Sequence, residues 1–277
     1  MNFISLNKLT TARELSVLKR VNDHLEESLE HFHPNQIVFI ALQGSQNYDL
    51  DVEGSDVDTK LILVPSLNDL IFNQKAVSTT HVRENDEHTD WKDLRLIFQT
   101  FRKQNLNFVE VLYSPWVFIN ETYLNEIKPL FDKRELIARY NPAGAVKTRR
   151  GIALEKYHAM EHRYPSKIEI IDKYGYDPKQ LHHLARVSDF LDRYINGYTY
   201  EECLHPVDRE YLKWLKTHAM PLDAARDLAN SLLEGINETS DKYRTEHPET
   251  ALPEGEELLN TVQEKIMRKA IGIELNG

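Results

Sequence analysis

The feature that most constrains the fold of this chain is a change in its apolar pattern near residues 141–144. Before that point, short apolar runs rich in β-forming residues alternate with helical patterns, whereas only helical patterns follow it. The first part therefore predicts an α+β domain, residues 1–142, in which a small mixed β-sheet is flanked by helices. The second part predicts an all-α helical domain, residues 143–277.

Within the first domain, Thr11 and Glu14 have the spacing of a helix-capping box, and apolar residues then repeat at helical spacing. Apolar runs predict buried strands at 36–42 and 56–64, and weaker strand candidates flank a polar turn at 84–87. An amphipathic helix is expected to start near Leu94. In the second domain, helical patterns cover 145–163, 178–196, 207–217, 222–243 and 255–272.

Charge and composition exclude several classes of protein. The chain has 44 acidic and 34 basic residues, a net charge of −10, so a polyanion must meet a local basic patch or a metal ion. The densest apolar run, Ile37–Leu42, is far shorter than the ~20 residues that span a bilayer. The first residues have no signal-peptide pattern, and the single cysteine, Cys203, excludes a disulfide framework. We expect a cytoplasmic protein without a membrane partner.

The most specific motif lies between the two expected strands. Gly44-Ser45 is followed, after ten residues, by Asp56-Val57-Asp58. Because side chains alternate along a strand, the two aspartates share one face, and such carboxylates repel each other unless a cation joins them. Hard divalent ions prefer oxygen ligands, and a Gly-Ser turn offers N–H groups and a hydroxyl to a phosphate. The motif predicts phosphoryl or nucleotidyl transfer that depends on Mg²⁺ or Mn²⁺.

Each half of this motif also has a simpler interpretation. A lone D-x-D is often a solvated strand end, and Gly-Ser is a common turn. The order of the two halves, between two apolar strands, favours the functional interpretation.

The motif resembles the signature of the DNA polymerase β superfamily of nucleotidyltransferases. Its fuller form, G-S-x-x-Y and then S-D-x-D, is similar to the stand-alone predicted nucleotidyltransferases of bacteria and phages. That family usually has glycine after the tyrosine, where this sequence has Asp49. Further downstream, 105–112 resembles the family's N-P-N-x-x-E-x-L element with leucine in place of proline, and 176–186 resembles its Y-D-x-K-x-x-x-H-x-x-R helix. The residues that match the fuller form are Gly44, Ser45, Tyr48, Ser55, Asp56 and Asp58.

This resemblance implies a polymerase β-like nucleotidyltransferase fold and transfer of a nucleoside monophosphate from an NTP, expected to be ATP, to a hydroxyl acceptor. The acceptor stays open between an RNA end, a protein and a small molecule. A different class of function also stays open. The protein could have the same fold without catalytic activity and act as a binding protein, such as an antitoxin-like partner. The intact pair of aspartates argues for the enzyme, since a binding module has no physical need for two facing carboxylates.

The superfamily also implies a third carboxylate from a later strand. Asp90 is the candidate for a catalytic and metal-binding role together with Asp56 and Asp58, and Glu87 is the alternative. Asp90 could instead cap the helix that follows it.

Three residues of the 178–196 helix, Lys179, His183 and Arg186, share one face at positions i, i+4 and i+7. Together with Gly44 and Ser45, the resemblance implies that they bind the phosphates of the nucleotide, although a solvated face is the simpler alternative. A second basic run, 147–150, is interpreted as surface.

Overall fold

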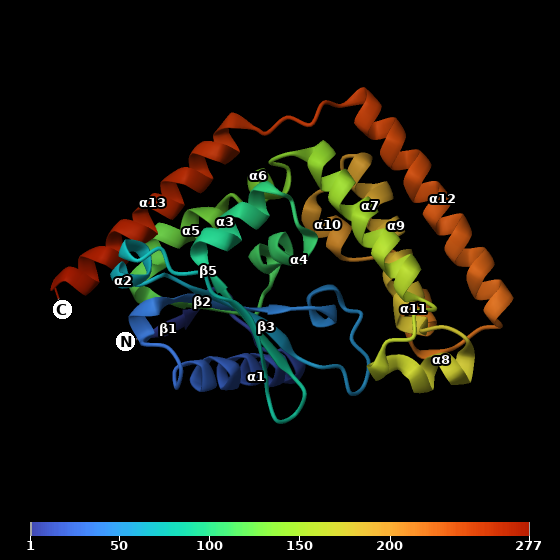
Figure 1. The fold of residues 1–277 in the computed structure, drawn as a ribbon, viewed down its shortest axis with the longest axis horizontal. Helices are drawn as coiled ribbons and strands as arrows, with labels where there is room; N and C mark the ends of the chain where they lie inside the picture. The colour runs from blue at the N-terminus through green and yellow to red at the C-terminus, as the bar shows by residue number, and fades with distance from the viewer. Residues whose placement is uncertain (1, 277) are drawn as a thin grey trace. The chain divides into compact units, whose positions relative to one another are not determined.

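The computed structural model describes residues 2–276, which divide into two compact units (Figure 1). Unit 1 contains Met1–Asn47, Gly54–Tyr140 and Ala251–Gly277, and unit 2 contains Tyr48–Glu53 and Asn141–Thr250. The chain thus enters the helical unit inside the spacer of the Gly-Ser and D-x-D motif. The division also differs from the predicted boundary, because the last helix groups with the sheet and not with the other helices.

Unit 1 is built on a six-stranded sheet in the order β1-β6-β2-β3-β5-β4. β3 and β5 are parallel and the other neighbouring pairs are antiparallel, so the predicted mixed sheet is confirmed. The strands that sequence reasoning missed, β1 and β6, are three and four residues long, too short for a readable period. The strands are β1 (Phe3–Ser5), β2 (Ile37–Gln43), β3 (Asp58–Leu63), β4 (Ser78–Val82), β5 (His88–Asp93) and β6 (Val117–Asn120).

The helices of unit 1 lie on both sides of this sheet, with α1 on one side and α3 and α5 on the other (Figure 1). The predicted capping box at the start of α1 is confirmed, because Thr11 and Glu14 exchange side-chain and main-chain hydrogen bonds. The helices are α1 (Ala12–Ser28), α2 (Leu67–Ile71), α3 (Leu94–Arg102), α4 (Leu106–Val109), α5 (Leu124–Asp132), α6 (Arg134–Ala138) and α13 (Pro253–Asn276), with 3₁₀ turns at η1 (Pro34–Gln36), η2 (Ser45–Tyr48), η3 (Glu110–Tyr113) and η4 (Glu121–Tyr123).

Packing of α1 decides which way the residues of β3 point. Val21 and Leu25 of α1 are buried in one cluster with Leu61 and Leu63 of β3. Burial of each such side chain stabilises the fold by about 1.5–3 kcal/mol, which fixes the odd-numbered residues of β3 on this side. We call this side of β3 and β5 the α1 face and the opposite side the carboxylate face, since alternation places Asp58 there.

Unit 2 is a helical bundle in which α9 packs against α7, α11 and α12. One residue of the 147–150 run is not at the surface as interpreted, because Arg149 is buried with its guanidinium 4.0 Å from the ring centroid of Phe190. No helix within residues 2–276 is both long and apolar enough to cross a membrane. The helices are α7 (Pro142–Ala159), α8 (Ile168–Tyr174), α9 (Pro178–Ile195), α10 (Tyr200–Leu204), α11 (Arg209–Thr217) and α12 (Leu222–Glu246), with the 3₁₀ turn η5 (Pro165–Lys167).

Candidate active site

The Gly44-Ser45 turn lies next to the D-x-D motif, although ten residues separate the two in the sequence. β2 ends at Gln43 and pairs antiparallel with β3, which brings Gln43 opposite Asp58. Gly44 follows with a φ of 101°, a backbone conformation that residues with a Cβ rarely adopt. The turn and the two aspartates therefore share one end of the β2–β3 pair.

Two buried side-chain amides fix this turn. Nε2 of Gln46 donates a hydrogen bond to the carbonyl oxygen of Asp56 (2.6 Å), and Nδ2 of Asn47 donates to the carbonyl oxygen of Leu42 (3.0 Å). The first bond joins the turn directly to the D-x-D segment. The relative positions of Ser45 and Asp56 are thus set by hydrogen bonds as well as by the chain between them.

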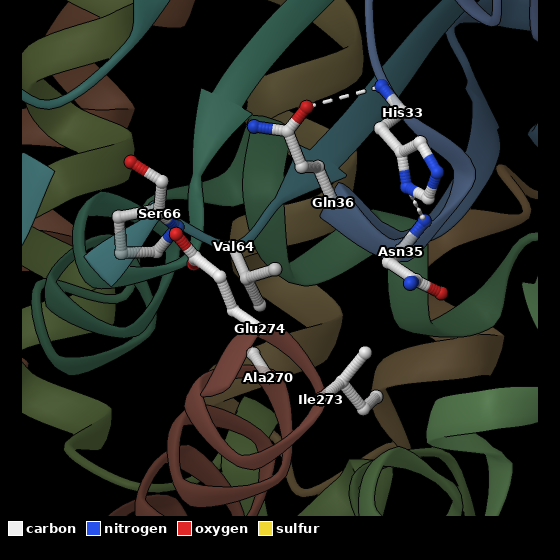
Figure 2. A pocket seen from close by; sticks show the side chains of 9 residues that line it. His33, Asn35, Gln36, Val64, Ser66, Ala270, Ile273 and Glu274 are labelled. Carbon is white, nitrogen blue, oxygen red and sulfur yellow. Dashed lines mark hydrogen bonds between the residues drawn. The ribbon is translucent and has the colours of Figure 1, made fainter. Parts of the chain in front are cut away.

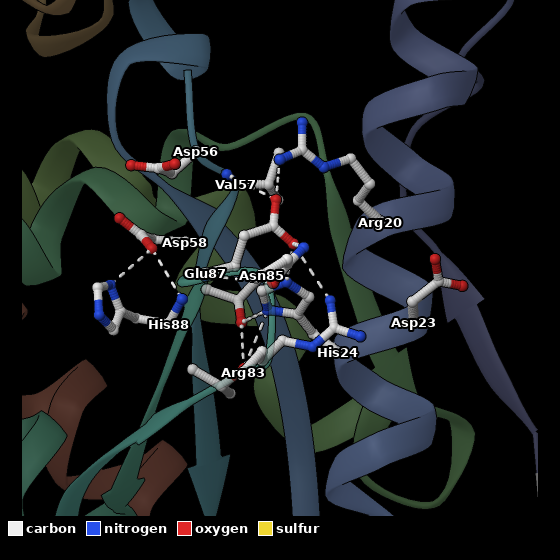
Figure 3. A network of polar contacts seen from close by, with 12 residues as sticks. Arg20, Asp23, His24, Asp56, Val57, Asp58, Arg83, Asn85, Glu87 and His88 are labelled. Atoms are coloured by element: carbon white, nitrogen blue, oxygen red, sulfur yellow. Dashed lines mark hydrogen bonds and ion pairs between the residues drawn. The ribbon is translucent and has the colours of Figure 1, made fainter. Parts of the chain in front are cut away.

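Asp56 and Asp58 lie on the carboxylate face, and the residue between them, Val57, is fully buried. Asp56 is exposed, and the Asp58 side chain is 33% exposed. Figure 3 shows the two carboxylates on the same side of the chain and Glu87 on the other side. The pair therefore presents carboxylate oxygens at the open end of the strand, and Mg²⁺ and Mn²⁺ prefer this kind of donor.

Asp90 lies on the carboxylate face of β5, opposite Lys60 of β3. Its Oδ2 is 3.0 Å from Nζ of Lys60, and its Oδ1 accepts a hydrogen bond from Thr80 (2.6 Å). Burial alone would raise the pKa of Asp90, but Lys60 and Thr80 together lower it below its ordinary value. The cap of α3 is Asp93 and not Asp90, so the capping alternative is wrong. The role of Asp90 as a third metal ligand stays a prediction.

Glu87, the alternative third carboxylate, is buried at the α1 face (Figure 3). Its carboxylate forms ion pairs with Arg20 and Arg83 and lies 3.0 Å from Nε2 of His24. Oε1 of Glu87 also accepts a hydrogen bond from the main-chain N–H of Val57 (3.1 Å). Glu87 therefore holds the main chain between the two aspartates, while its carboxylate points away from theirs.

His88 is a residue of this region that the sequence analysis did not single out. Its main-chain N–H donates to Oδ1 of Asp58 (2.9 Å), and its ring Nδ1 lies 3.2 Å from the same oxygen. The signal was in the strand register, because Thr89 pairs with Thr59 and the preceding residues, His88 and Asp58, must then face each other. The sequence alone does not contain that register.

Within residues 2–276, no three histidine, cysteine, aspartate or glutamate side chains form a ready-made metal centre. The chemistry of the donors at the strand end nevertheless suits a divalent ion, because two carboxylates reach solvent there beside the Gly44-Ser45 turn. An ion would be held by Asp56 and Asp58, with other positions left to water and substrate.

The sequence matches the model of the RNA repair pathway DNA polymerase beta family (RlaP) over residues 17–163, more than half of the chain. The chain belongs to this family. The predicted resemblance to polymerase β-type nucleotidyltransferases is thereby confirmed, and the matched region includes β2, β3 and β5. No curated protein matches the sequence.

One similar solved structure is a nucleotidyltransferase-like protein from Exiguobacterium sibiricum 255-15. It is 12% identical in sequence, and the match covers 94% of this chain and 90% of that chain with a TM-score of 0.33. The mixed sheet agrees with the match to the RlaP family.

The spacer between the Gly44-Ser45 turn and the D-x-D motif belongs in part to unit 2, since Tyr48–Glu53 group with the helices there. Asp49 has a φ of 58°, in the left-handed region, at the position where the resembled family has glycine. Aspartate is one of the few other residues that adopt this conformation, so the departure keeps the required backbone. Asp49 also forms an ion pair with Arg209 (3.1 Å), which fixes the spacer on the helical unit.

The predicted phosphate-binding stripe lies on α9 of unit 2. Lys179 is exposed, His183 is half-buried, and Arg186 places its guanidinium 4.0 Å from the ring centroid of Tyr48 in the spacer. Burial, and then the charges of neighbouring residues, lower the pKa of His183 well below its ordinary value, so its ring is neutral at pH 7. The stripe thus has two permanent charges, and its nucleotide-binding role stays a prediction.

A pocket elsewhere in unit 1 contains none of the predicted site residues (Figure 2). His33, Gln36 and Ser66 lie on one side of it and Glu274 of α13 on the other. Glu274 accepts a hydrogen bond from the main-chain N–H of Leu67 (2.7 Å), which joins the end of α13 to the start of α2. The pocket is a consequence of this packing and is separate from the D-x-D motif.

Proposed function

We propose that this protein transfers a nucleoside monophosphate from an NTP to a hydroxyl acceptor and releases pyrophosphate. The observation that carries this proposal is the common position of Asp56, Asp58 and the Gly44-Ser45 turn at one strand end. Family membership supports it independently, because this arrangement is the one that the polymerase β signature implies.

The residues have distinct proposed roles. Asp56 and Asp58 hold Mg²⁺ or Mn²⁺, while the Ser45 hydroxyl and the N–H groups after Gly44 hold the outer phosphates. The bound ion supplies a lowered pKa for the acceptor hydroxyl and compensates the charge of the leaving group. The acceptor oxygen bonds to the α-phosphorus as the bond from that phosphorus to the bridging oxygen breaks. The hydroxyl proton passes to solvent, and pyrophosphate leaves.

The acceptor that we propose is an RNA end. The family description names an RNA repair pathway, which supports RNA over a protein or a small molecule. ATP is the proposed donor, and Lys179, His183 and Arg186 are proposed to contact its phosphates. These finer assignments depend on the first proposal.

The test uses the purified full chain, each α-labelled NTP in turn, and Mg²⁺ or Mn²⁺. The acceptors are an RNA with a free 3′-hydroxyl, the same RNA with a 3′-deoxy end, and total protein from a lysate. Label on the first RNA alone supports the proposal with RNA as acceptor. Label on protein instead would support nucleotidyl transfer but identify a protein hydroxyl as the acceptor. The D58N variant is the control for a contaminating enzyme.

One observation favours the alternative of a binding protein without activity. Asp90, the expected third carboxylate, is already neutralised by Lys60, whose side chain is only 3% exposed. A site that kept two of three acids could bind nucleotide without transferring it. Absence of label with every NTP, both metals and all acceptors, together with tight binding of an NTP, would support this alternative.

A further inference from the structure

We propose that His88 is the third protein ligand of the ion held by Asp56 and Asp58. The site then has two carboxylates and an imidazole, and it prefers a first-row transition ion such as Mn²⁺ or Co²⁺ to Mg²⁺. This inference deepens the proposed function, because it names the metal class of the same site.

Geometry first selects His88 among the side chains of the neighbouring strand. Glu87 points to the α1 face, and both oxygens of Asp90 already have partners, Lys60 and Thr80. His88 is the residue that lies opposite Asp58 on the carboxylate face (Figure 3). Its side chain is 43% exposed, so its ring is accessible from the same opening as the two aspartates.

The separation of the donor atoms agrees with a shared ion. Two ligand atoms that each lie about 2.1 Å from one ion are about 3.0 Å apart in octahedral geometry and about 3.4 Å apart in tetrahedral geometry. Nδ1 of His88 and Oδ1 of Asp58 are 3.2 Å apart, between these two values. In the absence of metal the same separation is a hydrogen bond, which the ring gives up when its nitrogen binds the ion.

Two further hydrogen bonds orient the groups that would bind the ion. The main-chain N–H of His88 donates to Oδ1 of Asp58, which orients this carboxylate beside the ring. The set is not assembled among residues 2–276 without metal, so the proposal requires the exposed side chain of Asp56 to rotate towards the other two donors. Glu87 meanwhile fixes the main chain of Val57 between the two aspartates.

Ligand chemistry then predicts the metal. Imidazole nitrogen suits first-row transition ions, whereas Mg²⁺ is held by oxygen donors and keeps several waters. A third carboxylate at this position would favour Mg²⁺. Histidine there shifts the preference towards Mn²⁺ and the ions that follow it in the Irving–Williams order.

The test measures metal binding by the full chain without nucleotide. Free Mn²⁺ is counted by electron paramagnetic resonance, competition with Mg²⁺ gives the preference, and pulsed resonance detects ¹⁴N coupling from a bound imidazole. The variants are H88A, H88D and D90N, and H218A controls for an unrelated exposed imidazole. Circular dichroism establishes that each variant is folded.

We expect wild type to bind Mn²⁺ with ¹⁴N coupling and more tightly than Mg²⁺. H88A should lose the coupling and weaken Mn²⁺ binding at least ~10-fold, as loss of a ligand or its support typically does. H88D should also lose the coupling but recover affinity for Mg²⁺, whereas D90N and H218A should retain wild-type Mn²⁺ binding.

Three results would overturn the inference: wild type without Mn²⁺ binding, wild-type binding without ¹⁴N coupling, or an H88A variant with unchanged affinity. D90N weakening Mn²⁺ binding as much as H88A would also overturn it, because Asp90 would then be the third ligand. These outcomes are separate from the proposed function. If the protein binds Mn²⁺ through His88 but labels no acceptor, this inference holds and the proposed nucleotidyl transfer is wrong.

Discussion

The two faces of β3 and β5 use the same residue types in opposite ways. On the α1 face, Glu87 and His24 are buried and saturated with partners, among them Arg83. On the carboxylate face, Asp58 and His88 form a similar acid–imidazole pair that is open to solvent. The comparison shows that the parity of a residue's position along the strand decides which face its side chain occupies. Variants on the α1 face should therefore affect stability, and variants on the carboxylate face should affect activity.

The largest effect is expected for D58N, which removes a charge that we propose holds the metal but keeps an oxygen that can accept from the His88 N–H. Nucleotidyl transfer should fall by more than roughly 10⁴-fold, because the ion carries much of the rate enhancement. The free energy of unfolding, measured in urea, should stay within experimental error of wild type. Full activity in D58N would contradict the proposal that the carboxylate face carries the chemistry.

For the α1 face, E87A should lower the free energy of unfolding by about 3–5 kcal/mol, since it removes the buried carboxylate that pairs with two arginines and contacts His24. The Glu87 carboxylate is 2% exposed and pairs with both Arg20 and Arg83. Urea denaturation gives the value, and E87Q serves as the matched control because it retains an acceptor for the Val57 N–H. A stable but inactive E87A would mean that this residue acts in the chemistry.

The third effect is a pH dependence of stability from His24. Burial, and then the charge of Arg83, lower the pKa of His24 from 6.5 to about 4. Between these values the unfolded chain binds a proton at this residue and the folded chain does not, so stability falls as pH is lowered.

The stability advantage of wild type over H24Q should shrink by about 3 kcal/mol between pH 7 and pH 4, from a shift of ~2.5 pKa units. Denaturant titrations of both proteins at several pH values measure this difference. A constant difference across that range would mean that His24 titrates normally in the folded state.

The smallest effect is expected for S45A at the turn. One lost hydrogen bond to a charged phosphate is worth about 1.5–3 kcal/mol, or roughly 10- to 150-fold in kcat/KM. Steady-state kinetics with varied NTP would measure it, with D58N for scale. A loss in S45A equal to that in D58N would mean that the turn does more than hold phosphate.

Local sequence patterns predicted much of this arrangement because short-range periodicity encodes them. The strand at 36–42, the capping box at Thr11 and the shared face of Asp56 and Asp58 all follow from side-chain alternation or helical spacing. The polymerase β resemblance came from the same short stretch and is confirmed by the family match. Even the departure at Asp49 keeps the left-handed backbone that glycine would allow.

Other features depend on contacts between segments far apart in the chain. Arg149 is part of a basic run in the sequence, but packing of α7 against α9 buries it under Phe190. The last helix, α13, reads as one more helix of the second domain, yet it packs along α5 of the first unit. No local pattern reports such partners, because burial is a property of the assembled helices.

The identity of the residue that faces Asp58 is the most consequential of these features. The sequence by itself determined that two carboxylates meet at a strand end beside a Gly-Ser turn. It did not determine which of Glu87, His88 or Asp90 joins them, because a shift of one residue between β3 and β5 exchanges the faces. Tertiary packing decided this: α1 buries Leu61 and Leu63 on its own side of β3, and the register of Thr59 with Thr89 then turns His88 towards Asp58 and Glu87 away from it.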